Sequence, residues 1–250
     1  GVRILAPHFS IGDYCKVHRN TLMAGYQDMR LGHNAWIGQD CVFDSTGTLL
    51  AGDNLCVGAH SSLWSHMKYG DVTEGCRFAL TKQLTIGKDV WIGDSTVITP
   101  GTIQDKVLIL ANSVISHKCI RNRIYAGVPA VDKTEKMGGP PFNDVTLESK
   151  LLRLASLAYS FSQETGLDHT QLVMLPTAVG WGDGDPDKSY FFADERTYTK
   201  RLSSVEVAWM KWLMPHKAKF TPVDDPLQVR QVVELTDGEN VIGKRGKVVE

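Results

Sequence analysis

The sequence predicts a parallel β-helix over its first half, followed by a small α+β domain. Three observations lead to this prediction: a six-residue repeat of aliphatic residues, glycines that follow many of those residues, and a change of pattern near residues 134–145. The repeat is plainest in residues 37–42 (IGQDCV) and 92–97 (IGDSTV). A period of six fits neither the two-residue alternation of a strand nor the 3.6-residue period of a helix, and hexapeptide repeats are typical of β-helices.

Each hexad begins with an aliphatic residue, and its side chain should point into the coil. The repeat continues with interruptions to Ile115, with two extra residues near 46–48 and one residue missing before Ile103. We expect glycine at the second place to ease tight corners, and a small fifth residue to fit where the interior narrows. The glycines at the second place are Gly12, Gly32, Gly38, Gly52, Gly58, Gly87 and Gly93.

Composition excludes some classes of function. The chain has 250 residues, of which 42% are hydrophobic and 22% charged, which is ordinary for a folded protein with a sizeable core. Its 27 basic residues against 28 acidic ones give a net charge of −1, so nothing favours a nucleic-acid partner. No apolar run approaches the ~18 residues that a membrane span requires, so we expect no membrane span.

The cysteines also inform the prediction. An odd number without a CxxC pair fits neither a disulfide framework nor a zinc knuckle, and predicts free thiols in a reducing cytoplasm. Two of them occupy the fifth place of a hexad, where we expect buried spacers and not nucleophiles. The five are Cys15, Cys41, Cys56, Cys76 and Cys119.

Two segments carry a resemblance to a known family. Residues 84–131 contain a VWIG step, a PG corner, an ANSVI turn and a closing AGVPA segment, and residues 61–71 read SSLWSHMKYGD. Together they resemble the hexapeptide-repeat acyltransferases, and the second segment is similar to that of sugar and polysaccharide O-acetyltransferases. The resemblance covers about residues 10–133, although Gln104 and Leu110 stand where glycine is usual. It implies a left-handed β-helix, direct acetyl transfer from acetyl-CoA to a saccharide hydroxyl, and a homotrimer.

His66 is the candidate general base. A transferase of this kind must remove a proton from the acceptor as it attacks the thioester, and a neutral histidine suits that step. Of the eight histidines, only His66 matches the family's catalytic segment, and it stands where the hexads stop before an excursion over 67–83. A carboxylate should fix its tautomer. The candidates are Asp44, Asp71 and Glu74; backbone N–H groups or Ser65 could serve the oxyanion.

The resemblance also implies where the acetyl donor lies. CoA would occupy a groove between neighbouring β-helices, as a co-substrate, with no metal. The residues that match coil positions near that groove are Trp91, Gly93, Ala111 and Asn112. The cations that could meet the CoA phosphates are Lys118, Arg121 and Arg123.

The second half has a different pattern. Residues 134–145 read as a linker that contains Gly-Gly-Pro-Pro and separates a β-helix domain (1–133) from a domain over 146–250. In the latter we expect helices over 147–165 and 203–214, a strand over 172–179 and a terminal hairpin over 232–238. We recognise no family there, and expect this domain to shape acceptor access or assembly.

Three alternatives remain open. The acceptor could be the amine of an amino sugar or a nucleotide sugar. The chain could instead be a zinc enzyme on the same scaffold, similar to γ-class carbonic anhydrases, with His33, His60 and His66 as ligands across a subunit boundary. It could also be a non-catalytic scaffold. Metal analysis and a His66→Ala variant distinguish these classes.

Overall fold

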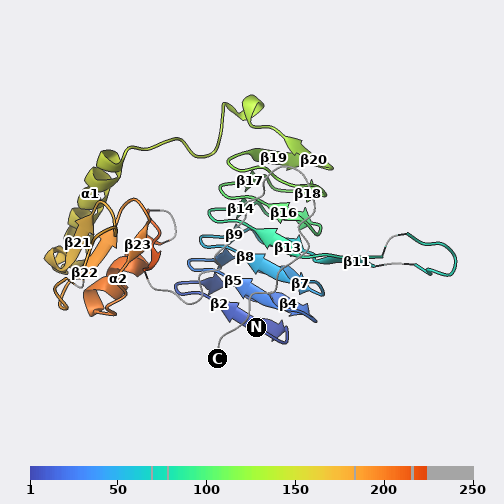
Figure 1. The fold of residues 1–250 in the computed structure, drawn as a ribbon, viewed down its shortest axis with the longest axis horizontal. Helices are drawn as coiled ribbons and strands as arrows, with labels where there is room; N and C mark the ends of the chain where they lie inside the picture. Colours follow the sequence, from blue (N-terminus) through green and yellow to red (C-terminus); the bar gives the residue numbers. More distant parts are fainter. Residues whose placement is uncertain (69, 78, 183, 215–216, 224–250) are drawn as a thin grey trace.

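A computed structural model describes residues 1–223 except 69, 78, 183 and 215–216. Figure 1 shows a stack of short coils, a hairpin that projects from one side of the stack, and a smaller helix-containing domain on the other side. The fold is a left-handed parallel β-helix followed by a small α+β domain, which confirms the predicted fold class. The hairpin expected over 232–238 lies outside the described residues.

Three parallel sheets form the three faces of the β-helix. The first face contains β1 (Arg3–Leu5), β4 (Leu22–Gly25), β7 (Val42–Ser45), β10 (Ser62–Leu63), β15 (Val97–Ile98) and β18 (Val114–Ile115). The second face contains β2 (Phe9–Ile11), β5 (Met29–Leu31), β8 (Leu49–Ala51), β13 (Leu84–Ile86) and β16 (Thr102–Ile103). The third face contains β3 (Lys16–Val17), β6 (Trp36–Ile37), β9 (Cys56–Val57), β14 (Trp91–Ile92), β17 (Leu108–Ile109), β19 (Ile124–Gly127) and β20 (Ala130–Asp132). All neighbours pair in parallel except β19 and β20, which are antiparallel.

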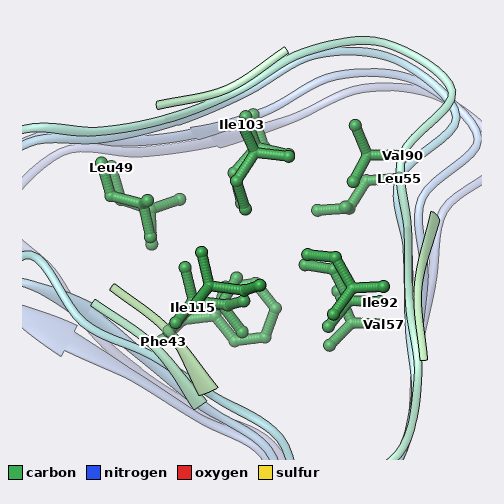
Figure 2. Close-up of a cluster of buried hydrophobic side chains, with 14 of the residues drawn as sticks. Phe43, Leu49, Leu55, Val57, Val90, Ile92, Ile103 and Ile115 are labelled. Carbon is green, nitrogen blue, oxygen red and sulfur yellow. The ribbon is translucent and has the colours of Figure 1, made fainter. Parts of the chain in front are cut away.

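The first residues of the hexads form columns inside the coil. On the first face, Met23, Phe43, Leu63, Ile98 and Ile115 pair in sequence from coil to coil, and each is at most 2% exposed. Figure 2 shows Phe43 and Ile115 overlapping in one such column. Full burial of a side chain of this size contributes about 1.5–3 kcal/mol, so the columns hold the coils together.

The corners correct one expectation about glycine. The residue in the left-handed region at most corners is the fourth of the hexad, as at Asn34 and Asp40, with φ of 59° and 57°. The glycine at the second place serves close approach between coils. A Cβ on Gly38 would lie 2.5 Å from the backbone nitrogen of Ala59, and one on Gly93 would lie 2.5 Å from that of Ala111. These glycines therefore mark where coils touch.

The C-terminal domain packs two helices on a four-stranded sheet. Its first helix begins after the capping residue Thr146 and ends at Gly166, which has φ of 72°. The strand expected over 172–179 ends at Leu175, because Pro176 has no N–H to donate to a neighbouring strand. The short helix η1 (Glu135–Met137) lies in the segment before the domain. The elements of the domain are α1 (Leu147–Thr165), η2 (His169–Gln171), β21 (Leu172–Leu175), β22 (Ser189–Phe192), β23 (Thr197–Tyr198), α2 (Ser204–Leu213) and β24 (Thr221–Pro222).

A chain of polar contacts joins this domain to the corner between the second and third faces. Asn34 Nδ2 donates to Asn54 Oδ1 at 3.0 Å, and Asn54 Nδ2 donates to Asp89 Oδ1 at 2.8 Å. Arg196 then donates to both oxygens of Asp89, at 2.9 and 2.5 Å. Asn34 also donates to the carbonyl oxygen of Phe220 at 3.0 Å. The corner residues of three successive coils thus anchor the C-terminal domain.

Candidate active site

His66 lies where the chain leaves the β-helix. It is the first residue of β11 (His66–Lys68), which pairs with β12 (Ala79–Thr81) in an antiparallel hairpin. The hairpin replaces the corner between the first and second faces, since the preceding strand is β10 and the next is β13. Figure 1 shows it projecting from the stack. The expected excursion after His66 is therefore present, and the histidine stands at its base.

The imidazole of His66 is paired with a buried carboxylate. His66 Nδ1 lies 2.8 Å from Asp44 Oδ1, and Asp44 is on β7 of the preceding coil. The Asp44 side chain is 10% exposed and that of His66 is 27% exposed. Because a carboxylate can only accept, Nδ1 carries the proton in this contact, and Nε2 is left with a free lone pair. This is the arrangement that a general base requires.

Asp44 is held in its charged form. Its Oδ1 accepts from Ser65 Oγ at 2.7 Å and from Ser65 N at 3.1 Å, and its Oδ2 accepts from Thr46 Oγ1 at 2.8 Å. Burial by itself raises the pKa of Asp44, but the hydrogen bonds from His66, Ser65 and Thr46 outweigh it and hold the pKa below its usual range. The carboxylate therefore stays ionised at neutral pH.

Ser65 was considered as a donor to the oxyanion, but in the structure its side chain contacts Asp44 instead. Its hydroxyl donates to Asp44 and accepts from Gly47 N at 2.8 Å. The side chain is fully buried and its one hydroxyl proton is donated to Asp44, so it positions the carboxylate and is not available to an oxyanion. The neighbouring Trp64 ring contacts the His66 ring edge to face at a centroid distance of 5.8 Å. Backbone N–H groups remain the candidates for the oxyanion.

Asp71 is not brought to His66 by the described contacts. It lies between the two strands of the hairpin, in the same turn as Glu74, and its carboxylate accepts from the backbone and hydroxyl of Thr73 at 2.8 and 2.6 Å. Those hydrogen bonds hold the pKa of Asp71 below its usual range. Of the three carboxylates considered from the sequence, the structure pairs Asp44 with the histidine.

Three of the expected donor residues share one groove. Trp91, Gly93 and Ala111 line a hollow of about 540 Å³ on the outer surface of the third face. Asn112 occupies the adjoining corner, with φ of 58°. The groove also contains Lys219, which follows α2 in the C-terminal domain. Sequence reasoning missed Lys219, because it lies outside the hexads and no motif surrounds it.

The three cations that were expected to bind the CoA phosphates lie outside this groove. Arg121 pairs with Asp105 at 3.6 Å, and Arg123 lies 3.6 Å from Glu135. Lys118 is exposed just beyond β18. None of the three lines the groove that holds Trp91. Within one chain, His66 does not line this groove. His66 lies at the corner between the first and second faces, whereas the groove lies on the third face.

The three histidines considered as zinc ligands occupy three different corners. His33 is 2% exposed, and its Nδ1 accepts from Asp13 N at 2.8 Å. His60 lies in the corner between β9 and β10, 3.9 Å from Asp40. Within the described part of the chain, no group of three or more histidine, cysteine, aspartate or glutamate side chains is placed to hold a metal ion.

Comparison with known proteins finds relatives of the β-helix. No family model matches the chain. It is 26% identical over 123 residues to galactoside O-acetyltransferase of Escherichia coli K12, a match that covers 48% of this chain and 60% of that protein. The chain thus matches about three fifths of the length of that curated relative.

Solved structures resemble it at lower identity. A maltose O-acetyltransferase from Clostridium difficile 630 is 21% identical with a TM-score of 0.36, covering 52% of this chain and 68% of that one. AntD, an N-acyltransferase from Bacillus cereus in complex with dTDP and 3-hydroxybutyryl-CoA, is 15% identical with a TM-score of 0.44, covering 66% and 88%.

Proposed function

We propose that this chain is a hexapeptide-repeat acyltransferase, and that it transfers the acetyl group of acetyl-CoA to a hydroxyl of a sugar or polysaccharide. The observation that carries the proposal is the His66–Asp44 pair at 2.8 Å, placed where the chain leaves the β-helix. A partly exposed imidazole backed by a largely buried carboxylate is suited to remove a proton from an acceptor.

The proposed reaction is a direct transfer. The acceptor hydroxyl gives its proton to His66 Nε2 as its oxygen attacks the thioester carbonyl carbon. Asp44 stabilises the imidazolium that results, because its carboxylate faces Nδ1. The tetrahedral intermediate then expels the sulfur of CoA, and the proton on Nε2 passes to that sulfur. No covalent acyl-enzyme is needed.

We place the acetyl donor in the groove that holds Trp91, Gly93 and Ala111. Because this groove and His66 lie on different sides of one β-helix, the proposal requires the groove of one chain to face the His66 of another. A cyclic homotrimer satisfies this requirement, since each interface then repeats the same pair of surfaces. Light scattering of the purified protein tests the trimer.

Residues 146–250 form a separate domain in this proposal, with 134–145 as its linker. We propose that the domain shapes acceptor access or assembly, supported by its contacts with the corner of the β-helix through Arg196 and Asp89. No helix among the described residues is long and apolar enough to cross a membrane. We propose a cytoplasmic location, which the five free cysteines support.

The experiment is an acceptor panel with acetyl-CoA and mass spectrometry of the products. The panel contains simple sugars, oligosaccharides, amino sugars and nucleotide sugars. The proposal expects a gain of one acetyl group on a sugar that has no amine, and loss of that gain on mild alkaline treatment, which cleaves esters. Acetylation restricted to amines would replace the O-acetyl proposal by N-acetyl transfer. Stoichiometric zinc with no acetylation would contradict both.

A further inference from the structure

A second hollow lies between α1 and the segment that follows α2. It has a volume of about 510 Å³ and is lined on one side by residues of α1 and on the other by residues 217–220. Five of its lining residues are cations, and no aspartate or glutamate lines it. In a chain with a net charge of −1, this concentration of positive charge is local and not a property of the composition. The five are Lys150, Arg153, Arg196, Lys217 and Lys219.

Two of the five cations already have carboxylate partners. Lys150 lies 3.2 Å from Asp194, and Arg196 makes its paired contact with Asp89. Over the residues that the structure describes, neither Arg153 nor Lys219 has a carboxylate within 4.0 Å. Their charges are therefore available to an anion that enters the hollow.

The surroundings of Lys219 also favour a bound anion. Its burial lowers the pKa of its ammonium group and outweighs the opposing effects of Cys56 and Asp89, and the nearby charge of Arg196 lowers the pKa further. In the same segment, the ammonium group of Lys217 lies 3.1 Å from the centre of the Trp212 ring. A bound anion would compensate the desolvated charge of Lys219, since charge-assisted hydrogen bonds are stronger than neutral ones.

Lys219 also links this hollow to the groove on the third face. It lines both, and the groove adds the side chains of Trp36 and Trp91, the second of which is 56% exposed. Aromatic faces of this kind stack with flat rings. The two hollows together therefore offer cations at one end and aromatic surface at the other.

We propose that the hollow between α1 and residues 217–220 binds the phosphoryl groups of a nucleoside diphosphate, whose base or attached arm extends into the groove beside Trp91. This chemistry is shared by two sources, the nucleotide part of CoA and the nucleotide of an activated sugar. The CoA source rests on the function proposed above, whereas the nucleotide-sugar source does not. In either case the C-terminal domain supplies the positive charge and the β-helix supplies the apolar surface.

The test is isothermal titration calorimetry on the full-length protein with CoA, UDP, adenosine and uridine. We expect CoA, UDP or both to bind, and the nucleosides that have no phosphate to bind at least about tenfold more weakly. Raising the salt concentration should weaken binding, because the contacts are ionic. Tight binding of CoA alone identifies the co-substrate as the source, and tight binding of UDP identifies a nucleotide-linked sugar as the source.

Variants connect that binding to the hollow. Lys219→Gln and Arg153→Gln should each weaken binding of the phosphorylated probe about tenfold or more. Lys211→Gln, on an exposed part of α2 outside the hollow, is the matched control and should leave it unchanged. Arg153 is exposed on α1, so its variant keeps the test valid if Lys219→Gln fails to fold.

Two results would overturn the proposal. One is the absence of binding by both phosphorylated probes. The other is binding that survives in the double variant Arg153→Gln/Lys219→Gln. Calorimetry measures binding and not turnover. If the proposed acetyl transfer at His66 is wrong, neither of these two results follows, so the two proposals can fail separately.

Discussion

Replacing Asp44 by asparagine should slow acetyl transfer while leaving the β-helix folded. Asparagine can keep its amide oxygen at the Oδ1 position, where it accepts from His66 and Ser65, and turn its amide group toward the Thr46 hydroxyl, which can accept. The geometry then survives, but the negative charge opposite the imidazolium is lost. A hydrogen bond to a charged group exceeds a neutral one by about 1–1.5 kcal/mol, which corresponds to about a tenfold loss in kcat.

Replacing Asp44 by alanine removes the charge and the geometry together. The Ser65 N–H and His66 Nδ1 then lose their acceptor, so the imidazole is no longer held in one tautomer. We expect kcat to fall toward the loss that follows from removing a general base, about 10²–10⁴-fold. The order of activity should therefore be wild type, then Asp44→Asn, then Asp44→Ala.

The assay is release of the CoA thiol with an accepting sugar from the panel, alongside circular dichroism and thermal unfolding to establish that each variant is folded. The matched control is Asp40→Asn, at a partly exposed coil corner away from His66, where φ of 57° favours asparagine as much as aspartate. An Asp44→Ala variant that is folded and retains the wild-type kcat would refute this role for Asp44.

Three further predictions concern stability and thiol reactivity. Gly38→Ala should lower the free energy of unfolding by about 1–3 kcal/mol in urea denaturation, because its Cβ would meet the next coil's backbone at 2.5 Å; an unchanged midpoint would contradict the close-approach explanation. Arg196 holds the pKa of Asp89 below its usual range despite the opposing effect of burial, so this pair stabilises the protein above about pH 4 and loses its effect as pH falls further. The thermal midpoint of Asp89→Asn should thus lie below that of wild type at pH 7 and approach it below pH 4, and a gap independent of pH would count against the pair. Burial raises the pKa of Cys41, and raises that of Cys119 to about 12, so neither thiol should react with iodoacetamide at pH 8 until the protein is unfolded, as peptide mass spectrometry would record.

The regular part of the fold could be predicted from the sequence because one residue type recurs at one place in each hexad. The columns through Phe43 and Leu63 follow from that periodicity. The reason for glycine at the second place does not follow from the periodicity, because a glycine such as Gly38 is equally consistent with a corner and with a close contact between coils. The distinction depends on the next coil, and a linear pattern does not contain that neighbour.

The candidate site could be predicted only in part for a similar reason. His66 is marked by the segment around it and by the end of the hexads. Its partner is set by the stacking of β7 beside β10, which brings Asp44 to the base of the hairpin although 22 residues separate the two side chains along the chain. Lys219 has no sequence signal, because its role depends on how the C-terminal domain packs against the third face.

The most direct test of the central claim is the rate of acetyl-CoA turnover by wild type and His66→Ala on the acceptor that the panel identifies. We predict that His66→Ala lowers kcat about 10²–10⁴-fold and leaves the KM for acetyl-CoA within a few-fold, since the imidazole acts on the acceptor proton. His60→Asn, at an exposed corner with φ of 60°, is the control and should retain wild-type turnover. A folded His66→Ala variant with unchanged kcat would contradict the account.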